Sequence, residues 1–417
     1  MQHGVGDAGE PPKAVEIIEV RKQRRGTEAS ELGAGCGAAG HGKHLETSRE
    51  PRNRATRDIA ASDDQYSFHE LIISRPMPFQ ISLAPGGQRF TAEDDQTILE
   101  AALAAGLLLP YGCRDGACGA CKGKVISGEV DLGEVSAGAL TDAERAAGLT
   151  LFCRAHARSD LVLEARNVSR ASDIPVRKLP CRVQRLERVA DDVMLLEVKL
   201  PASEPFRFRA GQYIDFLLSD GRRRGFSIAN APHRVDHLEL HIRRVEGGTF
   251  TGHVFTGLKE RDILRFEGPL GSFALREDSN RPIIMIAGGT GFAPIKSLIE
   301  HAIHIGLERP IALYWGARTR GGLYMDALAQ SWQNALPGFR YTPVLSEATP
   351  EDRWSGRTGL VHEAVMQDFP DLSGHEVYAC GAPAMIDAAR RDLVARCALA
   401  EDVFFSDAFT FASDPSR

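Results

Sequence analysis

Four cysteines in the first half of the chain have the spacing of ligands to iron. Three of them lie within nine residues and the fourth follows after a longer segment: Cys113, Cys118, Cys121 and Cys153. Four thiolates in the order C-x4-C-x2-C…C suit a [2Fe–2S] cluster, whereas zinc ribbons and four-iron clusters use other spacings. Gly112, Gly116 and Gly119 support this interpretation, because a cluster loop must wrap tightly and direct backbone N–H groups to the sulfurs. A structural zinc site and cysteines placed by chance are the less favoured alternatives.

A glycine-rich turn further along the chain is a second candidate for chemistry. Ile283–Ala287 has the composition of a buried strand, and Gly288, Gly289 and Gly291 follow it directly. Because glycine has no Cβ, these positions let backbone N–H groups approach a pyrophosphate at the start of the next helix. A glycine cluster alone is weak evidence, but the strand–loop–helix context favours a nucleotide site.

Length and composition restrict the class of protein. The chain has 417 residues, of which 43% are hydrophobic and 25% charged, which suggests about three globular domains. A formal net charge of −6 argues against a nucleic-acid partner. The longest apolar runs, Ala101–Leu109 and Ile283–Ala287, are shorter than the roughly 18 residues of a spanning helix, so we expect no membrane partner. We expect cytoplasmic localisation, because no signal peptide precedes the eight cysteines and reduced thiols explain them better than disulfides.

Residues 1–76 differ in composition from the rest of the chain. They are rich in Gly, Ala, Ser, Arg and Glu and have few aromatic side chains, so we expect a largely disordered extension. Cys36, His41 and His44 lie here, but they lack a fourth ligand and a surrounding fold, so a metal site is disfavoured. Met77 is the expected start of translation, or at least of the folded protein.

Residues 77–170 have an α+β pattern. Two alternating apolar segments around a Pro-Gly-Gly turn predict a hairpin, and a helix with Ile98 and Leu99 on its buried face follows. We expect Asp94 or Asp95 to cap this helix. The helix leads to the cysteine loop, and two further strands complete the domain.

Two more domains follow a short polar linker near residues 171–175. Six short strand-like runs within 178–278 predict an antiparallel β-barrel. Strands and helices alternate within 281–411, which indicates a doubly wound parallel sheet with its ligand at the carboxyl ends of the strands. The fold class is therefore multidomain, α+β followed by α/β.

The barrel segment resembles the FAD domain of the ferredoxin–NADP reductase superfamily, and residues 77–170 resemble a plant-type ferredoxin. The superfamily motifs R-x-Y-S and G-G-x-x-S/T correspond to Arg224–Ser227 and Gly247–Thr251. The resemblance implies that Arg224 pairs with the flavin pyrophosphate, that Phe226 packs against the isoalloxazine, and that Ser227 is a catalytic residue near N5. It also implies that Thr251 and the N–H groups of Gly248 and Thr249 bind the other phosphate. Phe226 departs from the usual Tyr and lacks its hydroxyl.

The glycine turn resembles the pyridine-nucleotide loop of the same superfamily, in the form G-G-T-G-x-x-P. The resemblance implies that a nucleotide binds at Gly288, Gly289, Thr290 and Gly291. Tyr378–Pro383 matches the second signature, which places Cys380 as a catalytic residue beside the nicotinamide and Gly381 in the groove; Cys380 could instead be a core thiol. Trp315–Arg318 is expected to contact the adenosine half. Arg318 and Arg320 could bind a 2′-phosphate, so NADH is favoured and NADPH stays open.

The order of the three modules resembles the CDP-6-deoxy-delta-3,4-glucoseen reductase family, and less closely the reductases of multicomponent oxygenases. Five segments carry the likeness, which covers about residues 77–411: Pro110–Lys124, Gly211–Leu217, Phe226–Pro232, Glu267–Phe273 and Phe405–Phe409. It implies an NAD(P)H-dependent reductase that passes electrons through FAD to the cluster and on to a partner protein, either a dehydrase or an oxygenase component. A redox-responsive binding protein is the alternative from another class. We expect the partner to contact the outer rim of the cysteine loop at Arg114, Asp115 and Lys122.

Overall fold

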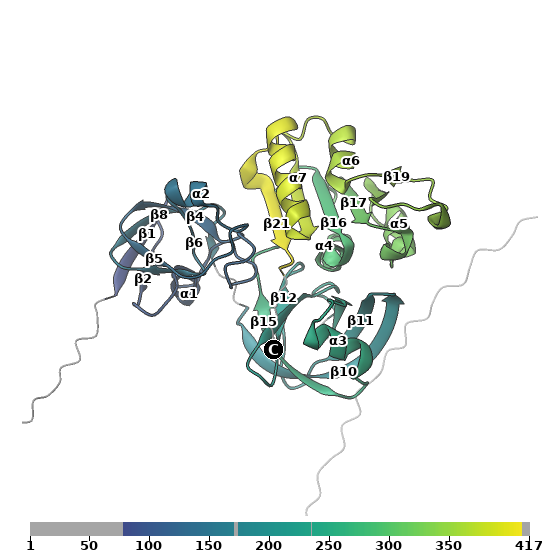
Figure 1. Cartoon of the computed structure of the whole chain (residues 1–417), viewed down its shortest axis with the longest axis horizontal. Coiled ribbons are helices and arrows are strands. Elements are labelled where there is room, and N and C mark those ends of the chain that lie inside the picture. Colours follow the sequence, from purple (N-terminus) through teal and green to yellow (C-terminus); the bar gives the residue numbers. More distant parts are fainter. Residues whose placement is uncertain (1–77, 171–173, 235, 411–417) are drawn as a thin grey trace, which may run out of the picture. The chain divides into compact units, whose positions relative to one another are not determined.

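The structure is a computed structural model that describes residues 78–170, 174–234 and 236–410 (Figure 1). The expected disordered extension, the proposed start at Met77 and the weak metal candidates Cys36, His41 and His44 lie outside these residues. So does most of the expected linker, at 171–173. All described residues belong to one compact unit.

The cysteine-containing segment folds around a mixed five-stranded sheet in the order β2-β1-β8-β4-β6. Strands β1 and β8 are parallel and the other neighbours are antiparallel. The elements, in chain order, are β1 (Phe79–Ala84), β2 (Arg89–Ala92), α1 (Ile98–Ala104), β3 (Leu107–Leu108), β4 (Lys122–Ser127), β5 (Val130–Leu132), α2 (Asp142–Ala146), β6 (Leu149–Leu151), β7 (Ala155–Ala157), β8 (Leu161–Glu164) and β9 (Ser169–Arg170).

Helix α1 begins one turn later than its aspartates suggest. Thr97 is the N-cap, and its hydroxyl accepts a hydrogen bond from the N–H of Glu100 while the Glu100 carboxylate accepts from the N–H of Thr97. The expectation that Asp94 or Asp95 caps the helix is therefore wrong, because this reciprocal capping box satisfies two backbone donors at once. Ile98 and Leu99 are buried, as predicted.

The second segment is a six-stranded antiparallel barrel in the order β13-β12-β15-β10-β11-β14. An antiparallel bridge between Ile228 and Leu240 joins the two ends of this order and closes the barrel. The elements are β10 (Arg177–Ala190), β11 (Val193–Lys199), β12 (Tyr213–Leu217), β13 (Arg223–Ser227), β14 (His237–Arg243), α3 (Thr249–Thr256) and β15 (Ile263–Leu270). The barrel prediction is confirmed.

The third segment is the predicted doubly wound sheet, with six parallel strands in the order β19-β18-β17-β16-β20-β21. Its elements are β16 (Ile283–Gly288), η1 (Gly289–Gly291), α4 (Phe292–His304), β17 (Ile311–Ala317), η2 (Arg320–Gly322), α5 (Asp326–Ala335), β18 (Phe339–Leu345), η3 (Pro350–Asp352), β19 (Arg357–Thr358), α6 (Val361–Asp368), β20 (Glu376–Gly381), α7 (Pro383–Arg396), η4 (Glu401–Val403) and β21 (Phe404–Ala408). The edge strands β19 and β21 were not predicted.

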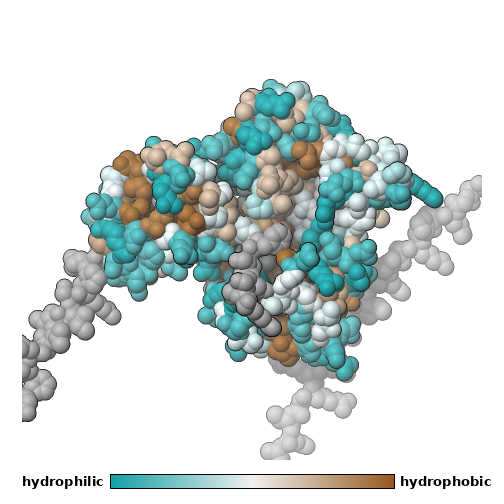
Figure 2. Space-filling view, in the orientation of Figure 1, coloured by the Kyte–Doolittle hydropathy of each residue, from teal (hydrophilic) through white to brown (hydrophobic). Residues whose placement is uncertain are grey.

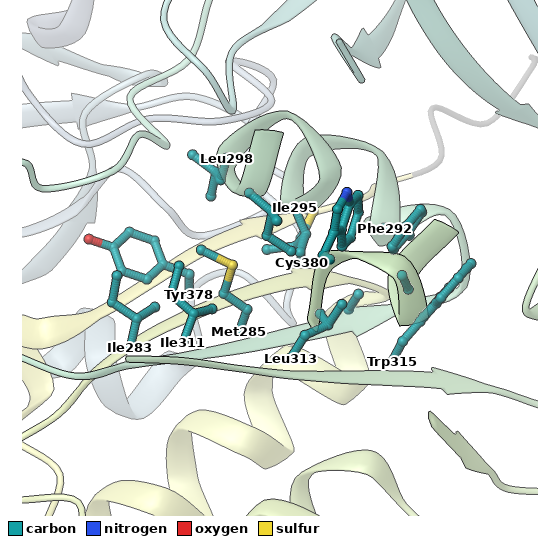
Figure 3. Packing of buried hydrophobic residues seen from close by; sticks show 14 of the residues in the cluster. Ile283, Met285, Phe292, Ile295, Leu298, Ile311, Leu313, Trp315, Tyr378 and Cys380 are labelled. Carbon is teal, nitrogen blue, oxygen red and sulfur yellow. The ribbon is translucent and has the colours of Figure 1, made fainter. Parts of the chain in front are cut away.

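Each strand of this sheet supplies alternate side chains to two separate cores. One core packs beneath α4 and α5, and the other packs beneath α6 and α7. Figure 3 shows Phe292, Ile295 and Leu298 of α4 against residues of β16, β17 and β20. Both faces are covered, so the strands are nearly continuous apolar runs, as parallel strands usually are.

On the face that Figure 2 shows, hydrophilic residues are interspersed with apolar areas, one of which lies over the cysteine-containing segment. The exposed large apolar side chains are distributed along the chain: Ile126, Val176, Ile263, Ile305 and Leu360. None of the helices in the described residues is both long and apolar enough to cross a membrane.

Candidate redox site

The cysteine loop between β3 and β4 positions the predicted cluster ligands. Backbone N–H groups point at the sulfurs: the N–H of Cys118 donates to Cys113 Sγ at 3.3 Å, and the N–H of Cys113 donates to Cys118 Sγ at 3.4 Å. The loop requires glycine at position 116. Its backbone is left-handed, at φ 82°, and a Cβ there would lie 3.0 Å from a backbone oxygen.

The four thiols lie as two pairs. Cys113 interacts with Cys118, and Cys121 interacts with Cys153. Within each pair, the interaction lowers the pKa of the second thiol, and together with burial it raises the pKa of the first. Two pairs of thiols fit two iron atoms, each with two protein ligands. The residues present therefore suit a [2Fe–2S] cluster, as the ligand spacing predicts.

The barrel places the predicted flavin residues on β13 and at the start of α3. Phe226 packs against Phe216 and Phe250, with ring centroids 5.9 and 5.6 Å apart. Helix α3 begins after Gly248, which has no side chain to cap the first N–H groups, so these can face an anion. Thr251 accepts a hydrogen bond from the N–H of Val245 at 3.1 Å, which holds the turn in front of the helix.

The rest of the predicted flavin set surrounds this turn. Arg224 donates from its guanidinium to the carbonyl of Arg223 at 2.8 Å, and the Thr249 hydroxyl accepts from Arg222 at 3.2 Å. Ser227 ends β13 and is buried. Arg224 and Ser227 thus lie on β13 and Thr249 lies at the start of α3, and the donors of these elements suit a pyrophosphate and a flavin ring.

The glycine turn lies at the carboxyl ends of the parallel strands, as predicted. It borders a groove of about 740 Å³ whose lining includes Gly288, Gly289, Thr290 and Arg318. Gly291 contacts the end of β20 so closely that a Cβ would lie 2.0 Å from the carbonyl oxygen of Cys380. The glycines therefore serve the packing of two strand ends as well as access for a nucleotide.

Trp315 does not line this groove. It is fully buried, stacks on Phe292 at 3.8 Å, and donates from Nε1 to the carbonyl of Gly289 at 2.9 Å. The expectation that it contacts adenosine is wrong for the side chain, because the indole supports the glycine turn from inside the core. Arg318 is exposed at the groove.

The two predicted catalytic residues converge on an aspartate that sequence reasoning missed. Asp407 of β21 lies 4.0 Å from Cys380 Sγ, and Ser227 is close enough to affect its pKa. Burial raises the pKa of Asp407 to about 6, and the Ser227 side chain opposes this rise. The segment Phe405–Phe409 carried the family likeness, but nothing in it marked Asp407 as a partner of the other two.

The cluster loop contacts the barrel beside this group. Ser272 and Tyr111 exchange hydrogen bonds: the Tyr111 N–H donates to Ser272 Oγ at 2.9 Å, and the Ser272 N–H donates to the Tyr111 carbonyl at 3.2 Å. Arg114 forms an ion pair with Glu267 of β15 at 3.7 Å. A Cβ at Gly112 would lie 3.5 Å from Asp407 Oδ1. All three predicted centres therefore meet near one carboxylate.

Comparison with known protein families agrees with this geometry. Residues 81–158 match the 2Fe-2S iron-sulfur cluster binding domain, 180–275 match the oxidoreductase FAD-binding domain, and 285–391 match the oxidoreductase NAD-binding domain. Fold and site together define an NAD-linked flavoprotein oxidoreductase that carries a [2Fe–2S] ferredoxin domain.

The match with individual relatives covers nearly the whole length of each relative. The CDP-6-deoxy-L-threo-D-glycero-4-hexulose-3-dehydrase reductase of Yersinia pseudotuberculosis is 43% identical over 80% of this chain and 99% of its own. The reductase component of phenol 2-monooxygenase from Pseudomonas sp. strain CF600 is 39% identical over 81% and 96%. A crystal structure of a cytochrome P450 reductase from Amycolatopsis superposes with a TM-score of 0.66 at 36% identity, covering 80% of this chain and 100% of that one. The chain belongs to the family of ferredoxin-fused flavin reductases that includes the CDP-6-deoxy-hexulose-3-dehydrase reductases.

Proposed function

We propose that Ser227, Cys380 and Asp407 form the site of hydride transfer and that electrons leave through the cysteine loop. When bound, the nicotinamide supplies a hydride to the flavin, which passes electrons singly to the cluster. Asp407 contacts both neighbours, so it can hold the Ser227 hydroxyl and the Cys380 thiol in place. The observation that carries the proposal is that Asp407 also lies beside Gly112 of the cluster loop.

The cofactor contacts in this proposal follow the predicted residues. The cluster is held by Cys113, Cys118, Cys121 and Cys153. FAD is held by Arg224, Phe226, Ser227, Gly248, Thr249 and Thr251. The nicotinamide nucleotide is held by Gly288, Gly289, Thr290, Gly291, Cys380 and Gly381. The close approach of Gly291 to Cys380, and the hydrogen-bond donors around β13 and α3, support these assignments.

We propose NADH as the preferred donor. Arg320, one of two candidates for a 2′-phosphate, donates from its backbone N–H to Asp352 Oδ1 at 2.9 Å and from its guanidinium to the Asp352 carbonyl at 3.3 Å. The Asp352 carboxylate would also repel a 2′-phosphate beside it. Steady-state kinetics should give a higher kcat/KM for NADH than for NADPH, and the reverse order would contradict this preference.

We propose a dehydrase acting on a CDP-hexose as the electron acceptor, by analogy with the Yersinia relative. The similarity to the phenol 2-monooxygenase reductase makes an oxygenase component the second candidate. Reduction of each purified acceptor by the NADH-reduced protein distinguishes a dehydrase from an oxygenase component.

The seven cysteines of the described residues are free thiols, which the reducing cytoplasm would preserve, so we propose that location.

We propose a smaller partner surface than the sequence suggested. Arg114 pairs with Glu267 of the barrel, so its charge is directed within the chain. Asp115 and Lys122 stay in the proposed surface, although Lys122 also pairs with Glu144 at 2.5 Å. Charge reversal at Asp115 should raise the KM for the acceptor protein; an unchanged KM would place the docking surface elsewhere.

The domain limits stay part of the proposal: 1–76 as an extension, 77–170 for the cluster, 178–278 for FAD and 281–411 for the nucleotide. The family matches fall within these limits, which supports them. Truncation to residue 77 should retain cluster and flavin, and loss of either would contradict this division.

Replacement of a cluster ligand tests the route of the electrons. Cys118→Ser should abolish NADH-dependent reduction of cytochrome c and spare reduction of ferricyanide, because ferricyanide can take electrons from the flavin. Cys181→Ala, at a buried thiol of the barrel, is the control and should keep both activities. Equal loss of both activities in Cys118→Ser would overturn the proposed order of carriers.

A further inference from the structure

A buried tyrosine of the barrel forms a hydrogen bond to the cluster loop. The hydroxyl of Tyr213, at the start of β12, donates to the carbonyl oxygen of Gly112 at 2.6 Å. Tyr213 is only 8% exposed, and burial raises its pKa well above the usual value, so the hydroxyl stays protonated and remains a donor. A buried tyrosine hydroxyl requires such a partner.

The carbonyl that Tyr213 contacts belongs to a peptide group with a second role. The peptide between Gly112 and Cys113 carries the N–H that donates to Cys118 Sγ at 3.4 Å. A donor at the carbonyl oxygen polarises the peptide group and makes its N–H a stronger donor, because hydrogen bonds in series reinforce one another. The series runs from the Tyr213 hydroxyl through one peptide group to a cluster ligand.

Hydrogen bonds to the sulfurs set the reduction potential of an iron–sulfur cluster. Reduction adds negative charge, and an N–H donor stabilises the charged, reduced form more than the oxidised form. We propose that Tyr213 raises the reduction potential of the [2Fe–2S] cluster by polarising the Gly112–Cys113 peptide. The barrel, which holds the flavin, thereby tunes the acceptor to which the flavin passes its electrons.

The packing around Tyr213 keeps this hydrogen bond in place. Gly271 has φ 91°, and a Cβ there would lie 2.9 Å from the Tyr213 ring, so glycine at position 271 leaves the space that the ring occupies. Tyr213 also pairs in register with Ser227 of β13, at the proposed flavin site. The tyrosine is therefore fixed to the flavin strand at one end and to the cluster loop at the other.

Another contact between the barrel and the loop provides a matched control. Ser272 exchanges hydrogen bonds with the backbone of Tyr111, but none of its hydrogen bonds goes to the Gly112–Cys113 peptide. Ser272→Ala therefore weakens the same interface without changing the donor to that peptide. Its effect separates docking of the loop from polarisation of the peptide.

The test is an EPR-monitored redox titration of the purified holoprotein. Tyr213→Phe, which keeps the ring, should shift the cluster midpoint to more negative potential and should change the g-values of the reduced cluster. The equilibrium of the electron between flavin and cluster should move toward the flavin by about two- to fivefold. This change is smaller than the loss of one whole hydrogen bond would produce, because Tyr213 acts on the sulfur only through the peptide. Ser272→Ala should leave both the midpoint and the g-values unchanged.

Replacement of Tyr213 by 3-fluorotyrosine gives a second, independent measurement. Its more acidic hydroxyl is a stronger donor, so the cluster midpoint should move to more positive potential. An unchanged midpoint in Tyr213→Phe, an equal shift in Ser272→Ala, or a shift of the same sign in Tyr213→Phe and the fluorotyrosine protein would each overturn the proposal. If Tyr213→Phe fails to retain its cluster, the fluorotyrosine protein alone decides: a positive shift supports the role of the hydroxyl, and no shift refutes it.

Discussion

At the scale of single residues, Asp407 lies where three predicted functions meet. It lies 4.0 Å from Cys380 Sγ, and the Ser227 side chain lowers its pKa; the resemblance assigns these two residues to the nicotinamide and the flavin. Burial raises its pKa to about 6, so the carboxylate loses its charge within a range that kinetics can reach. Asp407 is best described as a positioning residue for the two catalytic candidates.

The ionisation of Asp407 predicts a pH dependence of flavin reduction. Above about pH 6 the carboxylate can accept hydrogen bonds from both neighbours; below it, protonation removes part of that capacity. The rate of flavin reduction by NADH should therefore fall as the pH is lowered through 6. Asp407→Asn should be about ten- to a hundredfold slower, because small misplacements of reacting groups are costly, and its rate should no longer change near pH 6.

Stopped-flow absorbance of the flavin, recorded from pH 5 to 8, measures both effects. Asp402, which is exposed and precedes β21, offers the control substitution Asp402→Asn, and this variant should keep the wild-type profile. A pH step near 6 that persists in Asp407→Asn would show that another group titrates there.

Arg224 leads to a prediction about flavin content. Its guanidinium is the proposed partner of the FAD pyrophosphate, and Arg suits this role because its fork meets two phosphate oxygens. Arg224→Ala should yield protein with little bound FAD, measured as the ratio of flavin to protein absorbance after purification. Arg223 points to the opposite face of β13 and pairs with Glu267 at 2.8 Å, so Arg223→Ala should retain its flavin. Full FAD occupancy in Arg224→Ala would refute the assignment.

At the scale of elements, the turn between β16 and α4 tolerates no side chain at Gly291. An alanine Cβ would lie 2.0 Å from the Cys380 carbonyl oxygen, so either the turn or the end of β20 must move. Gly291→Ala should destabilise the protein by about 2–4 kcal/mol and raise the KM for NADH. Gly321 lines the same groove and has open space at its Cβ position, so Gly321→Ala should change the stability by less than about 0.5 kcal/mol. Thermal unfolding and steady-state kinetics measure these effects, and equal stabilities would contradict the packing argument.

Features that depend on local pattern could be predicted from the sequence. The alternation of apolar residues predicted the barrel strands and the core strands β16, β17, β18 and β20, and cysteine spacing predicted the cluster ligands. The sequence did not predict β21 as an edge strand, because Phe404–Ala408 is short and follows a helix without a turn signal. It also gave no sign that Trp315 is buried or that Arg114 pairs with the barrel, since both depend on how distant segments pack.

At the scale of the whole molecule, a buried charge network joins the flavin barrel to the nucleotide-binding sheet. Glu239 of β14 accepts a hydrogen bond from Lys296 of α4 at 3.2 Å and pairs with His241 at 2.8 Å. His241 in turn contacts the Tyr324 hydroxyl at 2.9 Å, and Lys296 also pairs with Glu300 at 2.9 Å. Breaking a buried pair by removing one partner is costly, because the other charge stays buried.

This network predicts how stability depends on pH. Burial alone would raise the pKa of Glu239, but His241 and Lys296 lower it to about 2, whereas the unfolded chain has the ordinary value near 4.5. Because the folded state holds this proton less tightly, the ionised Glu239 carboxylate contributes fully above pH 4.5, and its contribution is lost as the pH falls from 4.5 toward 2. The shift corresponds to a contribution on the order of 3 kcal/mol near neutral pH.

Glu239→Gln should therefore lower the thermal unfolding temperature at pH 7 and should flatten the acid dependence of stability. The fluorescence of released FAD, followed as the pH is lowered from 6 to 3, reports unfolding of the flavin region independently of the acid-labile cluster. Glu197 lies opposite Glu239 in register on β11 and pairs with Arg185 at 3.1 Å near the surface, so Glu197→Gln should change little. If Glu197→Gln and Glu239→Gln release FAD at the same pH and temperature, the network does not hold the barrel and the nucleotide-binding sheet together. If only Glu239→Gln releases it early, the Glu239 carboxylate stabilises the junction between the barrel and the nucleotide-binding sheet.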